Sequence, residues 1–423
     1  MISTPDNTNE HIDFDAENIS EQEVSRRFKW AKRQGNPAWL WPDIRVEDWR
    51  AALEQVARVA SAVLSGAAVP PRLDGDPAAI GLAGYTSGLG PLLGWWAETG
   101  AILPSPAVAR VLDLHLRHNR IRAARLDAAA VDLIGRLSRQ GIAVTVLKGA
   151  DTGRAYFPAP GVRPASDIDL LVRAEQASAA EAILRAEGFA EASRGARESS
   201  WRPPGCPTAP RSLTLVHADD PWSIDLHSAL DLMVSAGAPL AALDAGAPMD
   251  SRRAWAPGSE ATALEQPLLL FHLAIHAGAG LQNLTLLRLV ELNLVIRQDV
   301  AAGRLSWDAF LALGERIGLL GFAYPALTLC EALTPGVVPA LVLARCARAT
   351  PRGVLRVVRR LTPATAQRIE RSSVGEHFMW TDGWRRRIRQ LAADIAPRAG
   401  SWRALWSIYE KRAWRLVRGR VSR

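Results

Sequence analysis

The sequence predicts an α+β fold: a small mixed sheet flanked by helices, with an α-helical N-terminal region before it and a larger α-helical C-terminal domain after it. Short β-branched and apolar runs predict strands over residues 142–147, 167–172, 212–216 and 222–227. After Met233 no strand pattern is convincing, and apolar residues recur at helical spacing instead. The sheet is therefore expected to come from the middle of the chain.

The composition is that of an ordinary soluble globular protein. The chain has 423 residues, 48% hydrophobic and 22% charged, which gives room for about two or three domains with ample core. No apolar run reaches the length of a membrane span, and the acidic N-terminus is unlike a signal peptide. The three cysteines lack the spacing of metal ligands and fit a reducing compartment, so we expect a cytoplasmic protein.

We predict four parts along the chain. They are an acidic disordered tail (1–27), an N-terminal helical region (28–106), a core that carries the sheet (107–235) and an α-helical C-terminal domain with a basic tail (236–423). The tail is assigned from its charge, because residues 1–25 hold seven acidic side chains and no Lys or Arg.

Helical periodicity and capping signals place the helices. In the Pro- and Gly-rich N-terminal region one helix is predicted over 46–64, and one or two helices over 107–140 should pack on the sheet. A further helix over 175–187 should end at Gly188 as its C-cap, and the Gly-, Pro- and Ser-rich segment 195–210 should be an exposed loop. The C-terminal helices are predicted over 264–276, 284–296, 307–317 and 323–333.

The C-terminal segment 345–423 is strongly basic, with 20 Lys and Arg against 5 Asp and Glu. Tryptophans, among them Trp380, Trp402 and Trp406, are interleaved with these arginines, and from Trp402 to Leu416 the apolar residues recur at helical spacing. The aromatic face could pack on the helical domain, the arginines could bind an anionic acceptor such as RNA or a phosphorylated peptide, or the segment could lie in a membrane interface. We favour the first two interpretations, because a helical domain so near in sequence offers the aromatic face a place to be buried.

Asp167 and Asp169 are the first sign of chemistry. They are two residues apart on a predicted strand, so both carboxylates leave the same face. An Asp-x-Asp pair alone is more often an exposed strand edge than a metal site. Asp225, an acid between the apolar Ile224 and Leu226, supplies a third carboxylate on a later strand. We expect the three to converge on one face of the sheet, where a divalent cation would offset their repulsion.

Lys148 and Gly149 follow the first predicted strand and open a predicted helix. Lysine is scarce in this chain, which has only Lys29, Lys32, Lys148 and Lys411. Lys148 could be a solvated residue at a strand end. A lysine beside a helix N-terminus also suits a phosphate group, because exposed N–H groups and a positive point charge both favour an anion.

The order of these features resembles the DNA polymerase beta-like nucleotidyltransferase superfamily. Lys-Gly after a strand, then a helix, Asp-x-Asp on the next strand and a lone Asp on a later strand follow one another in that order. More narrowly, Leu147-Lys148-Gly149, Tyr156, Arg163, the run 167–172 and the run 224–227 resemble a largely uncharacterised bacterial nucleotidyltransferase family, over roughly residues 110–297. The wider superfamily has Gly-Ser or Gly-Gly after the first strand, where this chain has Lys148-Gly149. The narrower family also has Lys-Gly at this place.

The resemblance implies transfer of a nucleoside monophosphate from an NTP, ATP among them, to a hydroxyl or phosphate acceptor, with release of pyrophosphate. Asp167, Asp169 and Asp225 would be the catalytic residues and would hold two Mg²⁺ ions, or Mn²⁺ in their place. The nucleotide-binding residues would be Lys148, Gly149, Arg163 and Ser166. Relatives found beside biosynthetic genes for modified peptides favour a peptide or small-molecule acceptor.

Several further residues have more than one interpretation. Arg163 could also be a surface charge or the structural partner of an acid. His227 shares a strand face with Asp225 and could tune that carboxylate or contact substrate. The remaining candidates for a substrate pocket are His272 and His276, which could equally be core histidines, and Arg288 and Glu291, which could form a surface pair. The alternative function is a non-catalytic nucleotide-, RNA- or peptide-binding module that uses the basic C-terminus.

Overall fold

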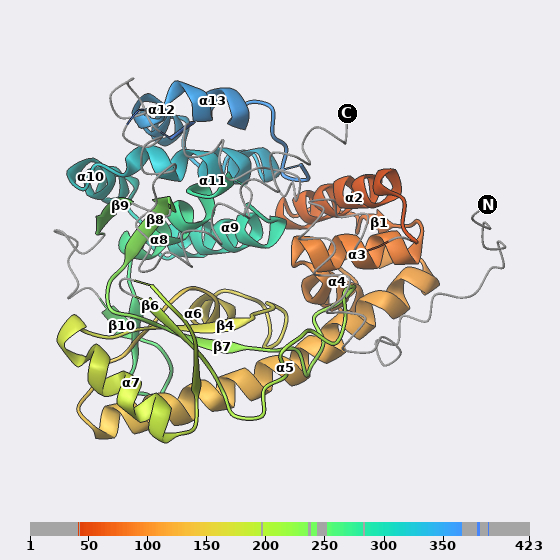
Figure 1. The fold of residues 1–423 in the computed structure, drawn as a ribbon. Coiled ribbons are helices and arrows are strands. Elements are labelled where there is room, and N and C mark those ends of the chain that lie inside the picture. Colours follow the sequence, from red (N-terminus) through yellow and green to blue (C-terminus); the bar gives the residue numbers. More distant parts are fainter. Residues whose placement is uncertain are drawn as a thin grey trace.

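The computed structural model describes residues 41, 43–195, 198–235, 238–242, 252–281, 284–365, 379–380 and 388, and Figure 1 shows how their elements are arranged. The predicted acidic tail and most of the basic C-terminal segment lie outside these residues. The predicted α+β class is confirmed, because helices precede and follow a mixed seven-stranded sheet. The domain boundaries given above stay a prediction.

The described N-terminal region is built from helices. Its elements are α2 (Val46–Leu64), β1 (Arg72–Leu73), α3 (Pro77–Ser87), α4 (Gly90–Glu98) and β2 (Leu103–Pro104). The helix predicted over 46–64 is confirmed as α2. Asp76 fixes the start of α3, since its carboxylate accepts hydrogen bonds from the backbone N–H groups of Ala78 and Ala79 at 3.4 and 3.0 Å.

A single long helix, α5 (Pro106–Arg139), confirms the helical prediction over 107–140. The Ser105 hydroxyl accepts from the N–H of Val108 at its N-terminus. In Figure 1, α5 and α7 (Ala177–Ala186) lie on the same side of the sheet. Residues such as Leu133 of α5 and Leu184 of α7 share one hydrophobic core with the buried side chains of the strands. The two helices thus cover that face of the sheet.

The seven-stranded sheet has the order β10-β11-β3-β4-β7-β6-β5. Its strands are β3 (Thr145–Val146), β4 (Asp167–Leu171), β5 (Ala190–Arg194), β6 (Glu198–Arg202), β7 (Ser223–His227), β10 (Arg252–Ala254) and β11 (Thr262–Leu264). The pairs β4–β7 and β11–β3 are parallel and the others are antiparallel, so the sheet is mixed. Two neighbouring strands in the middle of the sheet carry the three candidate acids: Asp167 and Asp169 lie on β4, and Asp225 lies on β7.

The strand predicted over 212–216 is wrong, because this segment forms a bend. The Ser212 hydroxyl accepts from the backbone N–H groups of Thr214 and Leu215 at 3.1 and 3.3 Å. Asp220 closes the segment by accepting from the N–H of Arg211 at 2.6 Å and of His217 at 2.9 Å. Side-chain acceptors thus take backbone donors that a strand would need for its neighbours.

The prediction of no strand after Met233 is also wrong, and so is the loop over the whole of 195–210. The hairpin of β8 (Asp231–Ser235) and β9 (Ala238–Ala242) is followed by β10 and β11, which extend the main sheet beside β3. These last strands have three residues each, too few to show an alternating pattern. In the supposed loop, β6 pairs with β7.

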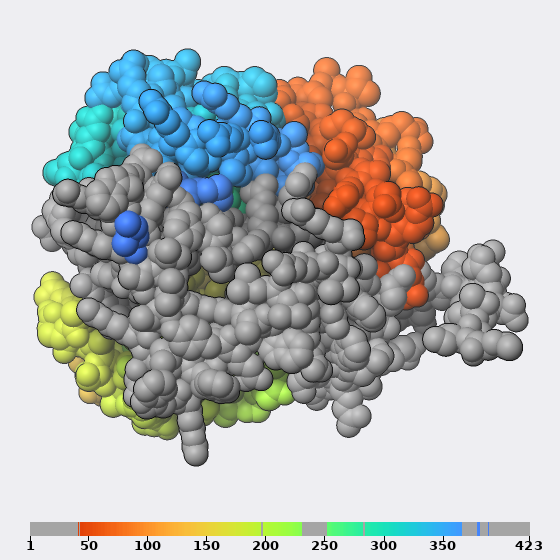
Figure 2. Space-filling view, turned by 45° about the horizontal axis from the view of Figure 1, so that its top comes forward, coloured from red at the N-terminus to blue at the C-terminus, as the bar shows by residue number. Residues whose placement is uncertain are grey.

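The C-terminal helices pack on the N-terminal ones. They are α8 (Leu268–Gly278), α9 (Leu286–Ala301), α10 (Trp307–Arg316), α11 (Leu320–Leu333), α12 (Ala340–Ala349) and α13 (Arg352–Val358). All four predicted helices are present, although α8 begins after 264 because β11 occupies that position. One hydrophobic core joins α2 and α3 to α8, α9 and α11, and Figure 2 shows the described N-terminal segments, in orange, beside the described C-terminal segments, in blue, on one face.

Trp380 tests part of the prediction for the C-terminal segment. Its indole is buried and stacks on Phe322 of α11 with the ring centroids 4.3 Å apart. At this residue the aromatic side chain packs on the helical domain, as the first interpretation expects, and the tryptophans beyond it lie outside the described residues. Within the part of the chain that the structure describes, no helix combines the length and apolarity needed to cross a bilayer.

Candidate active site

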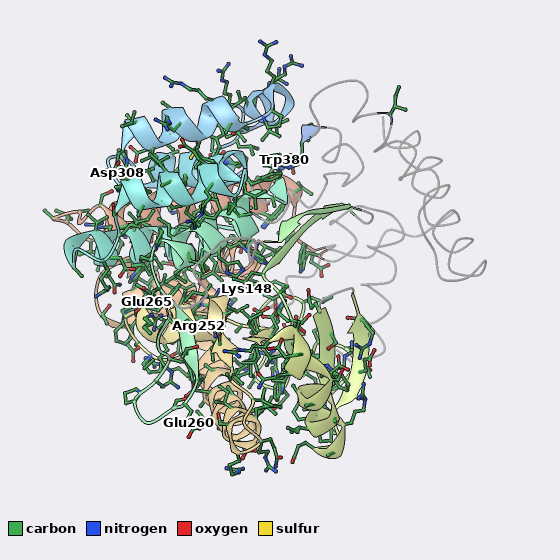
Figure 3. The ribbon with its side chains drawn as sticks, turned by 90° about the vertical axis from the view of Figure 1, so that its left-hand side faces the viewer. Lys148, Arg252, Glu260, Glu265, Asp308 and Trp380 are labelled. Atoms are coloured by element: carbon green, nitrogen blue, oxygen red, sulfur yellow. The ribbon has the colours of Figure 1, made fainter. Side chains whose placement is uncertain are left out.

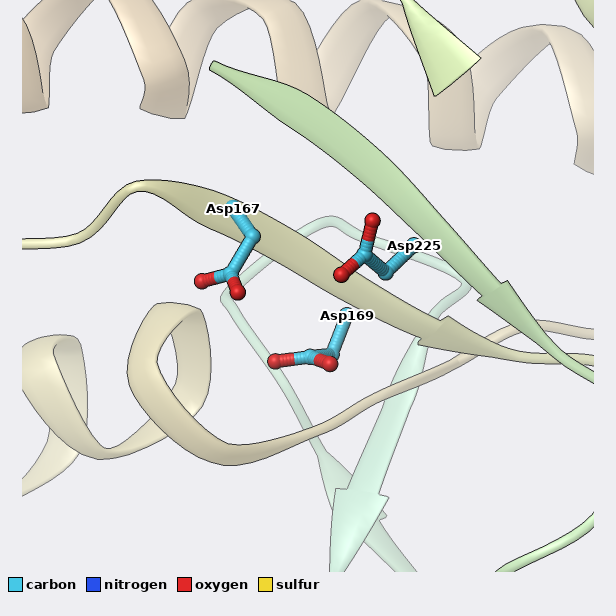
Figure 4. A group of neighbouring side chains, drawn as sticks. All are labelled: Asp167, Asp169 and Asp225. Atoms are coloured by element: carbon cyan, nitrogen blue, oxygen red, sulfur yellow. The ribbon is translucent and has the colours of Figure 1, made fainter. Parts of the chain in front are cut away.

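The three acids converge on one point of the sheet. In the parallel pairing of β4 and β7, Asp169 lies opposite Asp225, and Asp167 precedes Asp169 by two residues on the same face. One carboxylate oxygen from each lies within 4.8 Å of the others, and Figure 4 shows the three groups turned toward one another. Ile168 and Ile224, which alternate with them, are fully buried in the core beneath. The predicted convergence is therefore present.

Lys148 and His227 hold the central carboxylate. The Lys148 Nζ donates to Oδ1 of Asp169 at 2.8 Å, and Nε2 of His227 lies 2.9 Å from the same oxygen. Burial raises the pKa of Asp169, but the Lys148 ammonium and the His227 hydrogen bond outweigh it and leave the pKa well below its usual value. Burial, Asp169 and Asp225 together raise the pKa of Asp167 to about 6. The carboxyl group of Asp169 is thus firmly ionised, while that of Asp167 resists ionisation.

The donor set suits a hard divalent cation. Carboxylate oxygens are the ligands that Mg²⁺ and Mn²⁺ prefer, and three of them meet here. The contacts of Lys148 and His227 both use Oδ1 of Asp169, so they do not involve Oδ2. The Ser223 hydroxyl lies 3.1 Å from Oδ1 of Asp225 and helps to orient that group. The repulsion that raises the pKa of Asp167 is what a bound cation would relieve.

Lys148 stands at a strained turn between β3 and α6 (Lys148–Ala155). It is the one non-glycine residue in the described part of the chain with a positive φ, +45°, and such a conformation costs about 1–2 kcal/mol. The Leu147 N–H donates to the carbonyl of Asp169 at 2.9 Å, and the Thr152 hydroxyl oxygen lies 2.9 Å from the carbonyl oxygen of Lys148. Figure 3 shows Lys148 where the sheet meets the C-terminal helices. From this turn the Lys148 ammonium contacts Asp169.

Arg163 forms a buried ion pair with Glu291 of α9. Its Nε and Nη2 donate to the two carboxylate oxygens at 2.9 and 3.2 Å, and the side chains are 12% and 4% exposed. Thr152 donates to the same carboxylate. The guanidinium lies so close over Gly149 that a Cβ there would be 2.3 Å from Nη1. Arg163 is therefore a structural partner of an acid beside the Lys148 turn, and its contact with a nucleotide stays a prediction.

Residues 87–335, more than half of the chain, match the model of a family described as "Uncharacterised nucleotidyltransferase". The chain belongs to this nucleotidyltransferase family. No curated protein and no solved structure matches the chain. Within the matched residues lie β3, β4 and β7, so the acidic cluster of this nucleotidyltransferase falls inside the family's own region.

The other predicted residues of the nucleotidyltransferase site are distributed around the cluster. His272 and His276 are one turn apart on α8, with ring centroids 6.2 Å apart. Burial, then Lys148, lowers the pKa of His272 to about 3, and its buried Nδ1 has no hydrogen-bond partner among the described residues. Arg288 donates to the carbonyl of His276 at 3.1 Å, while Glu291 is taken by Arg163, so a surface pair of Arg288 with Glu291 is wrong. Ser166 is exposed, and its carbonyl accepts from the N–H of Ser223 at 3.2 Å.

Three residues near the site were not predicted. Ser223 could have been found, because it is two residues before Asp225 and shares its strand face. Thr152 could also have been found, because it lies one helical turn after Lys148. Glu198, whose carboxylate lies 3.8 Å from Nδ1 of His227, could not, since it depends on the pairing of β6 with β7.

Proposed function

We propose that this nucleotidyltransferase moves a nucleoside monophosphate from an NTP to a hydroxyl or phosphate acceptor and releases pyrophosphate. The acceptor oxygen would attack the α-phosphorus, the new oxygen–phosphorus bond would form, and the bond to the pyrophosphate oxygen would break. A hydroxyl acceptor would lose its proton to solvent. The observation that carries the proposal is the meeting of Asp167, Asp169 and Asp225 in one cluster.

The three acids would hold Mg²⁺ or Mn²⁺, and we propose two ions, with Asp167 and Asp169 contributing to both. Bound divalent ions supply charge stabilisation for the attacking and leaving oxygens of an in-line displacement. The protein contributes the fixed arrangement of the carboxylates, which the β4–β7 register and the buried residues beneath it impose. His227 would keep Asp169 oriented through its hydrogen bond.

Lys148 and the N-terminus of α6 would receive the phosphates of the NTP. The ammonium is already near the cluster, 2.8 Å from Asp169, and the helix N-terminus adds N–H donors and a favourable dipole. Gly149, Arg163 and Ser166 are proposed as further nucleotide contacts. We expect Lys148→Met to weaken NTP binding by about tenfold or more, the loss of one charge-assisted contact. Isothermal titration calorimetry of each NTP with Mg²⁺ measures this, and an unchanged dissociation constant would refute the phosphate role.

The test of the reaction is transfer from each α-³²P-labelled NTP, with Mg²⁺ or Mn²⁺, to components of a lysate from the protein's own cells. Asp225→Asn is the cleaner inactive variant, because the Asp169 carboxylate also holds Lys148 and His227. Label should enter a product with the wild-type protein and not with Asp225→Asn. Equal labelling by both proteins would show that the acidic cluster does not catalyse the transfer, and would refute the proposal.

A peptide or small molecule is our proposed acceptor, and the cytoplasm our proposed location, both from the sequence alone. The non-catalytic binding module is not favoured. A module that only binds would not need three carboxylates held within 4.8 Å of one another, an arrangement that costs stability through repulsion unless a cation is bound.

A further inference from the structure

A groove lies beside the acidic cluster, and the reaction as proposed above uses only Gly149, Arg163 and Asp167 of the residues that line it. It lies between α5, α6, the loop over 157–165 and the start of β4, and its volume is about 650 Å³. That is within the range of pockets that hold small molecules. Both Gly149 and Asp167 line it. The groove therefore adjoins the cluster and the turn that carries Lys148.

The walls of the groove are mostly small and apolar. Ala123 comes from α5, Ala150 from α6, and Phe157, Ala159 and Pro160 from the loop. Along α5 the lining extends from residue 119 to residue 130, which is about 16 Å at the rise of an α-helix. The groove is thus long enough for an extended group that passes beside Asp167.

The polar side chains of the groove are already engaged within the protein. The ion pairs are Arg120 with Glu98 at 2.7 Å, Arg154 with Asp127, and Arg163 with Glu291 at 2.9 Å. Arg122 donates to the carbonyl oxygens of Ala165, Asp220 and Pro221, and Asn119 to that of Gly161. Away from Arg163, which lies beside the Lys148 turn, the cations that line the groove are therefore neutralised or held by backbone groups, so that part of the groove offers little to a phosphate.

We propose that this groove binds an uncharged, largely apolar part of the acceptor, and that the acceptor's reactive oxygen lies beside Asp167. The proposal rests on the proposed transferase function. A nucleobase is the poorer occupant, because its polar edges would be buried against walls whose donors and acceptors are already used, and unpaired polar groups are costly to bury. An aliphatic or aromatic group loses nothing of this kind and gains from leaving water.

The test fills the groove from the side of α5. Ala123→Trp places an indole in it, and Ala128→Trp is the matched control, because residue 128 is exposed on the same helix and does not line the groove. The probe is N-phenyl-1-naphthylamine, a neutral apolar fluorophore, titrated into the full chain. We expect equal affinity in the wild type and Ala128→Trp, and a loss of about tenfold or more in Ala123→Trp. If Ala123→Trp does not fold, Ala124→Trp on the same wall replaces it.

Nucleotide titrations separate the possible occupants. If the apolar part of the acceptor occupies the groove, none of the four Mg-NTPs should displace the fluorophore. Each Mg-NTP should also bind Ala123→Trp and Ala128→Trp with the same affinity. Displacement by an NTP, or weaker NTP binding in Ala123→Trp alone, would show that the nucleoside occupies the groove and would overturn the proposal. So would fluorophore binding that is the same in all three proteins. A wild-type protein that binds no NTP would instead count against the proposed function, whatever the fluorophore does.

Discussion

Replacing Arg163 by methionine would break a buried ion pair while keeping much of the side chain's apolar length. Glu291, 4% exposed, would lose two hydrogen bonds, at 2.9 and 3.2 Å, and would keep the one from Thr152. Removing one partner of a buried pair costs about 3–5 kcal/mol, because the other charge stays buried without compensation. Since Thr152 compensates in part, we expect about 3 kcal/mol for Arg163→Met.

Urea unfolding followed by circular dichroism measures this loss. The double variant Arg163→Met/Glu291→Leu removes both charges, so it should be more stable than Arg163→Met alone, with a coupling of about 1–3 kcal/mol between the two sites. A loss below about 1 kcal/mol for Arg163→Met is what a solvent-exposed pair would give. That result, combined with weakened NTP binding, would contradict the structural role and favour a direct contact of Arg163 with the nucleotide.

Two further predictions concern single positions. Gly149→Ala should destabilise the protein by about 1–3 kcal/mol, because its Cβ would be 2.3 Å from Nη1 of Arg163. The control Gly135→Ala, in the open interior of α5, should stabilise the protein by up to about 1 kcal/mol. Equal changes in the free energy of unfolding, measured with urea, would refute the contact between residue 149 and Arg163. Burial lowers the pKa of His115 from 6.5 to about 4. As the pH falls from 6.5 toward 4, His115 is therefore protonated in the unfolded chain but stays neutral in the folded protein. The contribution of His115 to the free energy of unfolding is fully present above pH 6.5 and should fall by about 2 kcal/mol by pH 5. The variant His115→Gln should lose that part of the pH dependence. If the free energy of unfolding of this variant falls with pH as steeply as that of the wild type, the prediction is contradicted.

Period-two spacing was enough to predict that Asp167 and Asp169 share a strand face, whereas the place of Asp225 beside them was expected from its own strand pattern and from the resemblance to nucleotidyltransferases. Asp167 and Asp169 must share a strand face, and Asp225 joins them because β4 and β7 are neighbours in parallel register. Helices with strong periodicity were equally accessible, and α2 begins and ends where the pattern does. The shared face of Asp167 and Asp169 and the bounds of α2 depend on local sequence, which is why they could be predicted.

What could not be predicted depends on distant partners or on very short elements. Arg163 and Glu291 are 128 residues apart, and nothing local marks them as a pair. The strand β10 has three residues, yet Arg253 within it donates to both carboxylate oxygens of Asp151 on α6 at 2.6 and 2.7 Å. The segment 212–216 has the composition of a strand, but its Ser212 hydroxyl and the Asp220 carboxylate capture its backbone donors.

The most direct test of the central claim is the number of Mn²⁺ ions that bind at the acidic cluster. Electron paramagnetic resonance of free Mn²⁺, titrated with the protein and a non-hydrolysable NTP analogue, counts them. We predict about two ions per wild-type chain, as in two-metal transferases, and a loss of binding in Asp225→Asn with no change in the circular dichroism spectrum. Wild-type protein that binds no more Mn²⁺ than Asp225→Asn would contradict the assignment of Asp167, Asp169 and Asp225 as the metal-binding centre of the reaction.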